Sequence, residues 1–390
     1  MADSFHSFPS RLPQVGTTIF TVMSRLATEH GAINLSQGFP DFSPPALLPD
    51  RVAHHMATGA NQYPPMAGVA PLRAAVAAKL ERLYGARYDV ESEITITAGA
   101  TQALFTAIAA CVRPGDEVLV FAPVYDSYIP AVELQGGAVR VIKLAPPAFR
   151  PNWDEVAAAI NSRTRLIILN TPHNPTGTVW TADDMTALAN LVRNTDTVLL
   201  GDEVYEHIVF ADGPTAGQHA SLARLPELRE RSFVVSSFGK TYHITGWKVA
   251  YCAAPALLTA EFRKVHQFNV FTVHHPSQLA IADFMTAEPD FATGLAEFYR
   301  AKRDFFRQQL EGSRFDLLPS AGTYFQLARY DRINSMPDAE FVRWLTIEKG
   351  VAAIPVSAFM PDGTDHGLIR FCFAKNEATL AAAGAKLRGI

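Results

Sequence analysis

The sequence predicts an α/β fold: a three-layer sandwich with a mostly parallel sheet, accompanied by a smaller α+β domain. Between about residues 94 and 255, short and almost continuous apolar runs alternate with helical stretches. Strands of this composition are typical of a parallel sheet covered by helices on both faces. After about residue 290, a long amphipathic helix and a few short strands follow instead. A chain of 390 residues is also long enough for two domains.

The first 50 residues contain many proline, serine and phenylalanine residues and show little periodicity. Only the stretch 19–30 has helical spacing, and the tract SQGFPDFSPP at 36–45 holds too much proline and glycine for a helix. We therefore expect residues 1–50 to form an N-terminal arm that belongs with residues 286–390 in the small domain. Residues 51–285 are expected to form the large domain.

Apolar periodicity predicts the individual elements. Two helices precede the sheet, at 47–58 and 69–84. The predicted strands of the large domain are 94–97, 118–121, 139–144, 165–169, 197–200, 233–237 and 249–252. The helices between them are expected at 101–112, 152–161 and 181–194. For the small domain we expect a long helix from about 290, strands at 324–328 and 369–373, and a helix near 338–349.

The composition excludes several classes of protein. Charged residues make up 18% of the chain, against ~25% on average, and the net charge is −4. Such a balanced chain has no positive field for phosphate backbones, so nucleic-acid binding is not expected. The uncharged stretches 94–112 and 265–282 are interrupted by polar residues, which predicts buried segments, not membrane spans. Widely separated cysteines with apolar neighbours and a start without a secretory signal predict a cytoplasmic protein.

Polar residues follow five of the predicted strands. Ligands of open α/β sheets bind beyond the carboxyl ends of the strands, so these residues would share one binding edge. Taken singly, each residue is weak evidence for a binding site, because an aspartate after a strand is usually a helix cap and a lysine is usually a surface charge. Neither a nucleotide-binding glycine pattern nor a metal-binding spacing is present, and no metal site is predicted. The strand-end residues are Gly99, Ala100, Thr101, Tyr125, Asn174, Asp202, Tyr205, Ser237 and Lys240.

Taken together, this set resembles the fold-type I pyridoxal-phosphate enzymes, specifically the class I/II aminotransferases, over about residues 13–388. The most specific motifs are Asn170–Gly177, Asp202-x-x-Tyr205 and Ser237-x-x-Lys240-x7-Lys248. Within the family, four segments are most similar to the bacterial methionine aminotransferases and also to the kynurenine/glutamine aminotransferase branch. These segments are 33–42, 60–68, 237–252 and 369–375.

The resemblance implies pyridoxal 5'-phosphate as the cofactor and a catalytic role for three residues. Lys240 matches the lysine that forms a Schiff base with the cofactor aldehyde and then carries the proton of the substrate Cα. Asp202 matches the carboxylate that keeps the pyridine nitrogen protonated. Tyr205 and Asn174 match the two groups that bond the phenolic oxygen of the cofactor. Tyr125 matches the ring that stacks on the pyridine.

The resemblance also implies a phosphate site and a shared active site. Backbone amides of Ala100 and Thr101, after Gly99, would bind the phosphate at a helix start. Ser237 would add a hydroxyl, and Lys248 stands where many relatives carry arginine. Tyr63 matches the tyrosine that reaches the phosphate of the neighbouring subunit, which implies a homodimer in which each site is built from two chains.

On the substrate side, Arg370 matches the arginine that clamps the α-carboxylate, with Asn174 beside it and Gly38 approaching through its backbone. The N-terminal arm, the Phe39 loop, Tyr63 and the partner's 268–278 segment would line the remainder. No second arginine stands in an evident position. The resemblance therefore implies transfer of the amino group of methionine, aromatic or similar apolar amino acids to a 2-oxo acid.

Three other functions compete with transamination. A cysteine-S-conjugate β-lyase would use the same residues, because both reactions begin with loss of the Cα proton to Lys240; a transaminase that prefers kynurenine or glutamine is a further variant. A ligand-sensing regulator would carry a basic helix-turn-helix domain ahead of the resemblance, for which no room is expected. A non-catalytic scaffold is disfavoured because Lys240, Asp202 and Arg370 are all present.

Overall fold

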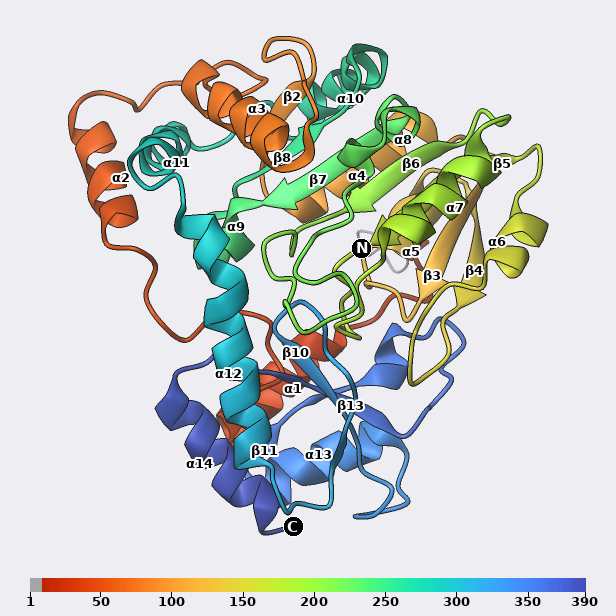
Figure 1. The fold of residues 1–390 in the computed structure, drawn as a ribbon, viewed down its shortest axis with the longest axis vertical. Coiled ribbons are helices and arrows are strands. Elements are labelled where there is room, and N and C mark those ends of the chain that lie inside the picture. Colours follow the sequence, from red (N-terminus) through yellow and green to blue (C-terminus); the bar gives the residue numbers. More distant parts are fainter. Residues whose placement is uncertain (1–8) are drawn as a thin grey trace, which may run out of the picture.

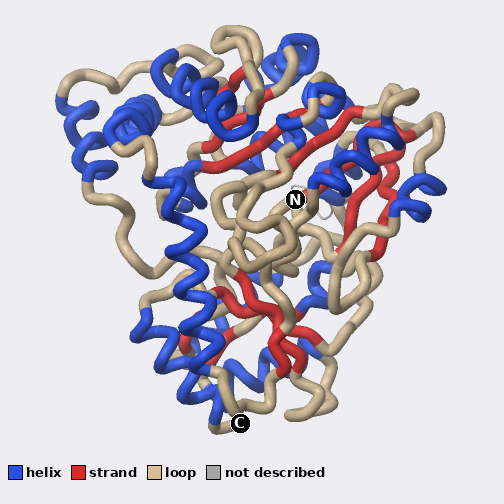
Figure 2. The backbone as a smooth tube through the Cα atoms, viewed as in Figure 1, coloured by secondary structure: helices blue, strands red, loops and turns tan. Residues whose placement is uncertain are grey.

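The computed structural model of the protein describes residues 9–390, so the start of the predicted arm lies outside the described residues. Figure 1 shows two lobes, which we call the large lobe and the small lobe. The large lobe contains a seven-stranded sheet and the small lobe a four-stranded one. Figure 2 shows the strands gathered in these two groups, with helices around each. The predicted α/β class is confirmed.

In the large sheet the strands lie in the order β2-β8-β7-β6-β5-β3-β4. All pairs are parallel except those of β8, which is antiparallel to both of its neighbours. All strands except β8 therefore point the same way, and their carboxyl ends share one edge of the sheet. The strands are β2 (Ile94–Thr97), β3 (Glu117–Ala122), β4 (Ala138–Lys143), β5 (Thr164–Asn170), β6 (Val198–Asp202), β7 (Ser232–Ser237) and β8 (Ala250–Ala253).

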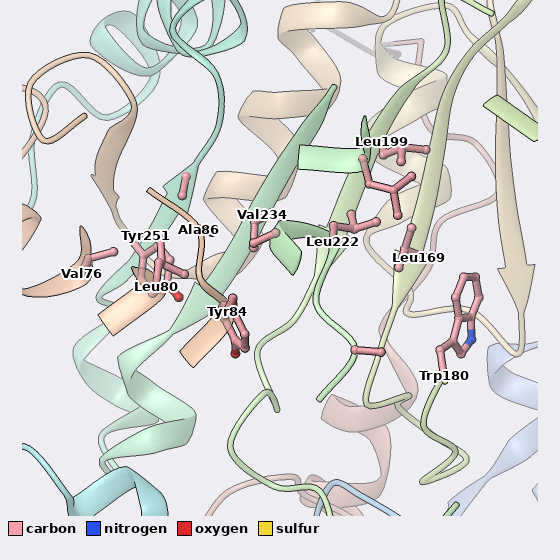
Figure 3. Close-up of a cluster of buried hydrophobic side chains, with 14 of the residues drawn as sticks. Val76, Leu80, Tyr84, Ala86, Leu169, Trp180, Leu199, Leu222, Val234 and Tyr251 are labelled. Atoms are coloured by element: carbon pink, nitrogen blue, oxygen red, sulfur yellow. The ribbon is translucent and has the colours of Figure 1, made fainter. Parts of the chain in front are cut away.

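Two apolar cores cover the two faces of this sheet, because successive strand residues point to opposite sides. One core combines Leu169, Leu199 and Val234 with side chains such as Val76 and Trp180, and Figure 3 shows this cluster. The other core combines the alternate strand residues with α4, α5 and α10. The helices of the large lobe are α2 (Leu47–Ala57), α3 (Ala70–Tyr84), α4 (Ala100–Cys111), α5 (Tyr128–Leu134), α6 (Trp153–Ala159), α7 (Ala182–Val192), α8 (Pro226–Arg229), α9 (Phe238–Thr241), α10 (Ala256–Asn269) and α11 (His275–Ala287).

The small lobe is built from both ends of the chain. Helix α1 contacts α13 and β11, and strand β1 pairs with β11 in parallel. Figure 1 shows α12 running from the large lobe into the small one. The predicted domain limits at residues 50 and 286 stay a prediction. The elements of this lobe are α1 (Ile19–Glu29), β1 (Ile33–Asn34), α12 (Leu295–Gln309), β9 (Asp316–Leu317), β10 (Phe325–Arg329), α13 (Asp338–Lys349), β11 (Val351–Ala352), β12 (Ile354–Pro355), β13 (Leu368–Cys372) and α14 (Glu377–Arg388).

The two uncharged stretches belong to this fold. Residues 94–112 form β2 and α4, and 265–282 form the end of α10, the turn after it and most of α11. Among residues 9–390, no helix combines the length and the apolar character that a membrane span requires.

A buried ion pair lies behind the strand ends. Glu206 accepts hydrogen bonds from the Lys79 ammonium at 2.6 Å, from the Tyr251 hydroxyl at 3.1 Å, and from Ser236 and Tyr84. Burial alone would raise the pKa of the Glu206 carboxyl, but the Lys79 charge holds it well below its usual value. The pair connects α3 to the loop that follows β6.

We expect Glu206→Ala to lower the free energy of unfolding by about 3 to 5 kcal/mol, because it leaves the Lys79 ammonium buried without a counterion. Urea unfolding followed by circular dichroism would measure this. Glu261→Ala is the control, since the pair that Glu261 forms with Lys264 is solvent-exposed and is worth about 1 kcal/mol or less. Equal unfolding midpoints for the two variants would contradict the prediction.

Candidate active site

A cavity of about 340 Å³ lies at the carboxyl edge of the large sheet, where residues of both lobes line it. Strands β2, β5, β6 and β7 end at this edge, as the parallel pattern predicted. The small lobe contributes residues of β10 and β13. The sequence-predicted residues that line the cavity are Gly38, Gly99, Ala100, Thr101, Tyr125, Asn174, Asp202, Tyr205, Ser237, Lys240, Lys248 and Arg370.

Lys240 enters the cavity from α9, the short helix that follows β7. Its ammonium donates hydrogen bonds to the Tyr324 hydroxyl at 2.8 Å and to the Gly38 carbonyl at 3.1 Å. Burial lowers the pKa of Lys240 to about 8, and the nearby charges of Lys248 and Arg370 act in the same direction. An amine with this pKa is partly neutral near pH 7.5 and can act as a nucleophile or a base.

Asp202 is the last residue of β6, and its carboxylate is buried. One carboxylate oxygen accepts the Tyr128 hydroxyl at 2.6 Å. Burial raises the pKa of Asp202 to about 6, although the Tyr128 hydrogen bond and the Lys240 charge both lower it. The side chain of Asn170 joins the ends of two strands, since it donates to the Asp202 carbonyl and accepts the Asn174 backbone N–H, both at 2.8 Å.

An anion-binding corner lies at the start of α4. No side chain caps this helix, so the first backbone N–H groups, including those of Ala100 and Thr101, are free to bind a ligand. Gly99 has φ +82°, and a Cβ built on it would lie 3.0 Å from the Lys248 ammonium. Free amides at a helix start beside a lysine suit a phosphate group. The Ser237 hydroxyl accepts the Gly239 N–H at 3.2 Å.

Arg370 lies on β13 and is only 1% exposed. Its guanidinium donates to the Asn174 side-chain oxygen at 2.6 Å and to the Ser36 carbonyl at 2.9 Å, while its Nε has no partner. Burial lowers the pKa of Arg370 to about 10, which leaves it charged at neutral pH. Among residues 9–390 it forms no salt bridge. A buried cation without a counterion at a cavity wall is suited to bind a carboxylate.

Two of the predicted site residues lie outside the cavity of a single chain. Tyr63 is 82% exposed, and its ring meets the edge of Phe271 at 5.5 Å. Phe39 is 42% exposed, and its carbonyl accepts the Lys375 ammonium at 2.8 Å. Their roles in the site stay predictions.

The sequence reasoning missed several residues of the site. Asn170, within the Asn170–Gly177 motif, lines the cavity without a role predicted from the sequence, and so do Phe20, Gln37 and Phe325. Tyr128 is the first residue of α5, and its contact with Asp202 joins residues 74 positions apart, so the sequence carried no signal for it. The same holds for Tyr324, whose contact with Lys240 joins residues 84 positions apart.

One cavity at the edge of a mostly parallel sheet contains a lysine, a buried carboxylate and an anion-binding corner. This is the arrangement of the fold-type I pyridoxal-phosphate enzymes. The chain belongs to the aminotransferase class I and II family, which it matches over residues 30–387. It is therefore an aminotransferase, and its cofactor is pyridoxal 5'-phosphate. The family, the enzyme class and the cofactor implied by the sequence are confirmed.

Relatives and solved structures agree with this assignment. The chain is 56% identical to the methionine aminotransferase of Escherichia coli (strain K12), over 97% of each chain. It is 35% identical to human kynurenine–oxoglutarate transaminase 1, over 93% of each. The crystal structure of YbdL from Escherichia coli, for which a methionine aminotransferase function was identified, superposes with a TM-score of 0.96 at 55% identity. That match covers 99% of this chain and 100% of the other.

The residues present fit the cofactor. A buried carboxylate faces the cavity without a salt-bridge partner among residues 9–390, and a ring nitrogen that carries a proton would supply its counterion. The uncapped start of α4 and Lys248 would bind the phosphate group of the cofactor, and the Lys240 amine would bind its aldehyde.

Proposed function

We propose that the protein transfers the amino group of methionine, or of a similar apolar or aromatic amino acid, to a 2-oxo acid. The observation that carries this proposal is the wall around Arg370. Its guanidinium lies over the Phe325 ring at 3.9 Å and near the Phe20 ring at 5.5 Å. Among the described residues no second arginine lines the cavity, so an apolar side chain fits better than a second carboxylate. The likeness to methionine aminotransferases supports the same donor class.

Each residue then has a physical task. When bound, pyridoxal phosphate supplies an electron sink for the negative charge that develops at the substrate Cα. Asp202 would hold a proton on the pyridine nitrogen, and the Lys240 amine would take the proton from Cα. Arg370 would bind the α-carboxylate and orient the Cα–H bond toward Lys240. Tyr205 and Asn174 would bond the phenolic oxygen.

The test is a screen of the twenty common amino acids as donors against several 2-oxo acids, with the product oxo acids measured. We expect methionine and the aromatic amino acids to be the best donors. No oxo-acid formation from any donor would overturn the proposal. Release of pyruvate and thiol from a β-substituted cysteine, without amino transfer, would establish the β-lyase instead.

Arg370→Lys should raise KM for every amino donor by about tenfold to 100-fold, because lysine keeps the charge but loses the two-pronged hydrogen bonding of the guanidinium. Steady-state kinetics with methionine and two aromatic donors would measure this. Arg329→Lys, on the neighbouring strand β10, is the control, since Arg329 does not line the cavity. An effect on one donor alone would mean that Arg370 does not hold the common carboxylate.

We further propose a homodimer with shared active sites. Several large apolar side chains are exposed: Leu257 at 79% and Phe268 at 87% lie on α10, and Tyr63, at 82%, contacts Phe271 just beyond that helix. An oligomer would bury them. If Tyr63 completes the neighbour's site, mixing inactive Lys240→Ala and Tyr63→Ala chains should restore activity, because each hybrid dimer contains one intact site. A monomer in sedimentation equilibrium would overturn this.

We also propose that the protein is cytoplasmic. This rests on Cys111, Cys252 and Cys372, which are free thiols, as expected in a reducing compartment. Fractionation of cells with immunodetection would test it, and recovery outside the cytoplasmic fraction would overturn it.

A further inference from the structure

The hydroxyl of Tyr324 is the direct neighbour of the Lys240 amine. It donates a hydrogen bond to the Gly38 carbonyl at 2.6 Å and lies 2.8 Å from the Lys240 nitrogen. That nitrogen also donates to the Gly38 carbonyl, at 3.1 Å. The three atoms form a closed triangle that joins α9, the start of β10 and the N-terminal loop.

The donor and acceptor roles within this triangle are fixed. A phenol carries a single proton, and Tyr324 gives it to the Gly38 carbonyl, so toward Lys240 its oxygen can only accept. Burial raises the pKa of Tyr324 well above its ordinary value, so the phenol does not ionise. The Tyr324 oxygen is therefore a fixed, neutral acceptor for an N–H of Lys240.

The surroundings hold the Tyr324 ring in place. The ring is fully buried and makes aromatic contacts with Tyr205 at 5.1 Å, Phe325 at 4.9 Å and Tyr299 at 5.5 Å. The residue before it, Thr323, has a left-handed backbone with φ +66° and donates its N–H to the Ile208 carbonyl at 2.9 Å. A non-glycine residue keeps this conformation only where the surrounding structure enforces it.

We propose that Tyr324 is a positioning residue for Lys240: its hydroxyl holds the free amine beside Gly38 and directs it toward the substrate Cα. The proposal rests on the proposed transamination, in which the Lys240 amine must be set free and then take the proton of the substrate Cα. It also ties the position of the amine to the N-terminal loop, since both bond the same Tyr324 oxygen.

The test variant is Tyr324→Phe, which keeps the ring and removes only the oxygen. Tyr299→Phe is the matched control. Tyr299 is an equally buried neighbour whose hydroxyl lies 3.0 Å from Nδ1 of His243 and has no hydrogen bond to Lys240. A loss of packing or folding would affect both variants alike, whereas loss of positioning would affect only Tyr324→Phe.

The first measurement uses cofactor-free protein. The pKa of Lys240 is obtained from the pH dependence of its acetylation, followed by mass spectrometry. Without the phenol oxygen the ammonium loses a hydrogen-bond acceptor, so we expect the pKa to fall by about one pH unit in Tyr324→Phe and to stay unchanged in Tyr299→Phe. The other charged or titratable groups around the amine are the same in both variants: Asp202, Tyr205, Lys248, Arg370 and Cys372.

The second measurement uses the holoenzyme with methionine and with methionine deuterated at Cα. We expect kcat of Tyr324→Phe to fall about tenfold with a larger isotope effect, while KM stays near that of the parent protein. Unchanged values of both the Lys240 pKa and kcat would overturn the proposal, as would equal losses in the two variants. If the parent protein forms no oxo acid at all, the proposed function fails, and the acetylation data still decide the role of Tyr324.

Discussion

Lys240→Ala is expected to abolish transamination and the covalent attachment of the cofactor. Lys240 is the amine placed in the cavity by α9, and burial lowers its pKa to about 8, where a neutral amine is available. Loss of both the nucleophile and the base should reduce kcat by about 10⁴-fold or more. Borohydride reduction followed by peptide mass spectrometry would show whether the cofactor is still fixed to the chain.

Lys248→Ala is the matched control, because Lys248 is another lysine that lines the same cavity. It lies beside Gly99 at the anion corner, so its loss should weaken cofactor binding but leave covalent fixation intact. Fixation of the cofactor in Lys240→Ala, at any other lysine, would remove Lys240 from its assigned role.

Asp202→Asn is expected to lower kcat by about 100- to 1,000-fold with little change in KM. Asparagine has the same shape but no charge, so it cannot hold a proton on the pyridine nitrogen, and a preorganised electrostatic partner is lost. Steady-state kinetics with methionine would measure this. Tyr128→Phe is the graded control: it keeps the Asp202 carboxylate and removes one hydrogen bond of 2.6 Å, for a loss of about tenfold at most. Equal activity of Asp202→Asn and the parent would contradict the assignment.

The raised pKa of Asp202 also predicts that the stability of the cofactor-free protein depends on pH. Its pKa is raised from 3.8 to about 6 by burial. The folded state therefore binds the proton more tightly than the unfolded chain, and the parent protein should lose stability as the pH rises from about 4 to about 6. Asparagine does not titrate, so Asp202→Asn should gain stability relative to the parent over that window. Urea unfolding at several pH values would detect it, and a constant difference would contradict it.

Much of the fold could be predicted because the hydrophobic pattern carries it. Apolar runs such as 94–97 and 165–169 fall within β2 and β5, and the helix expected near 338–349 is α13 (Asp338–Lys349). The pattern showed which segments are strands but not how they are ordered. The antiparallel insertion of β8 between β2 and β7 depends on pairing between segments far apart in the chain.

The candidate site, too, could be predicted from the sequence only in part. By itself, the sequence determined which polar residues follow the strands. It also determined that these residues lie together, because a sheet with parallel strands brings their carboxyl ends to one edge. That rule is enough to group Asp202, Asn174 and Lys240. Only the tertiary structure decided what touches them: Tyr128 on Asp202 and Tyr324 on Lys240 come from residues 74 and 84 positions away. The Tyr128 contact depends on how α5 packs on the large sheet, and the Tyr324 contact on how the two lobes meet. No local periodicity encodes either.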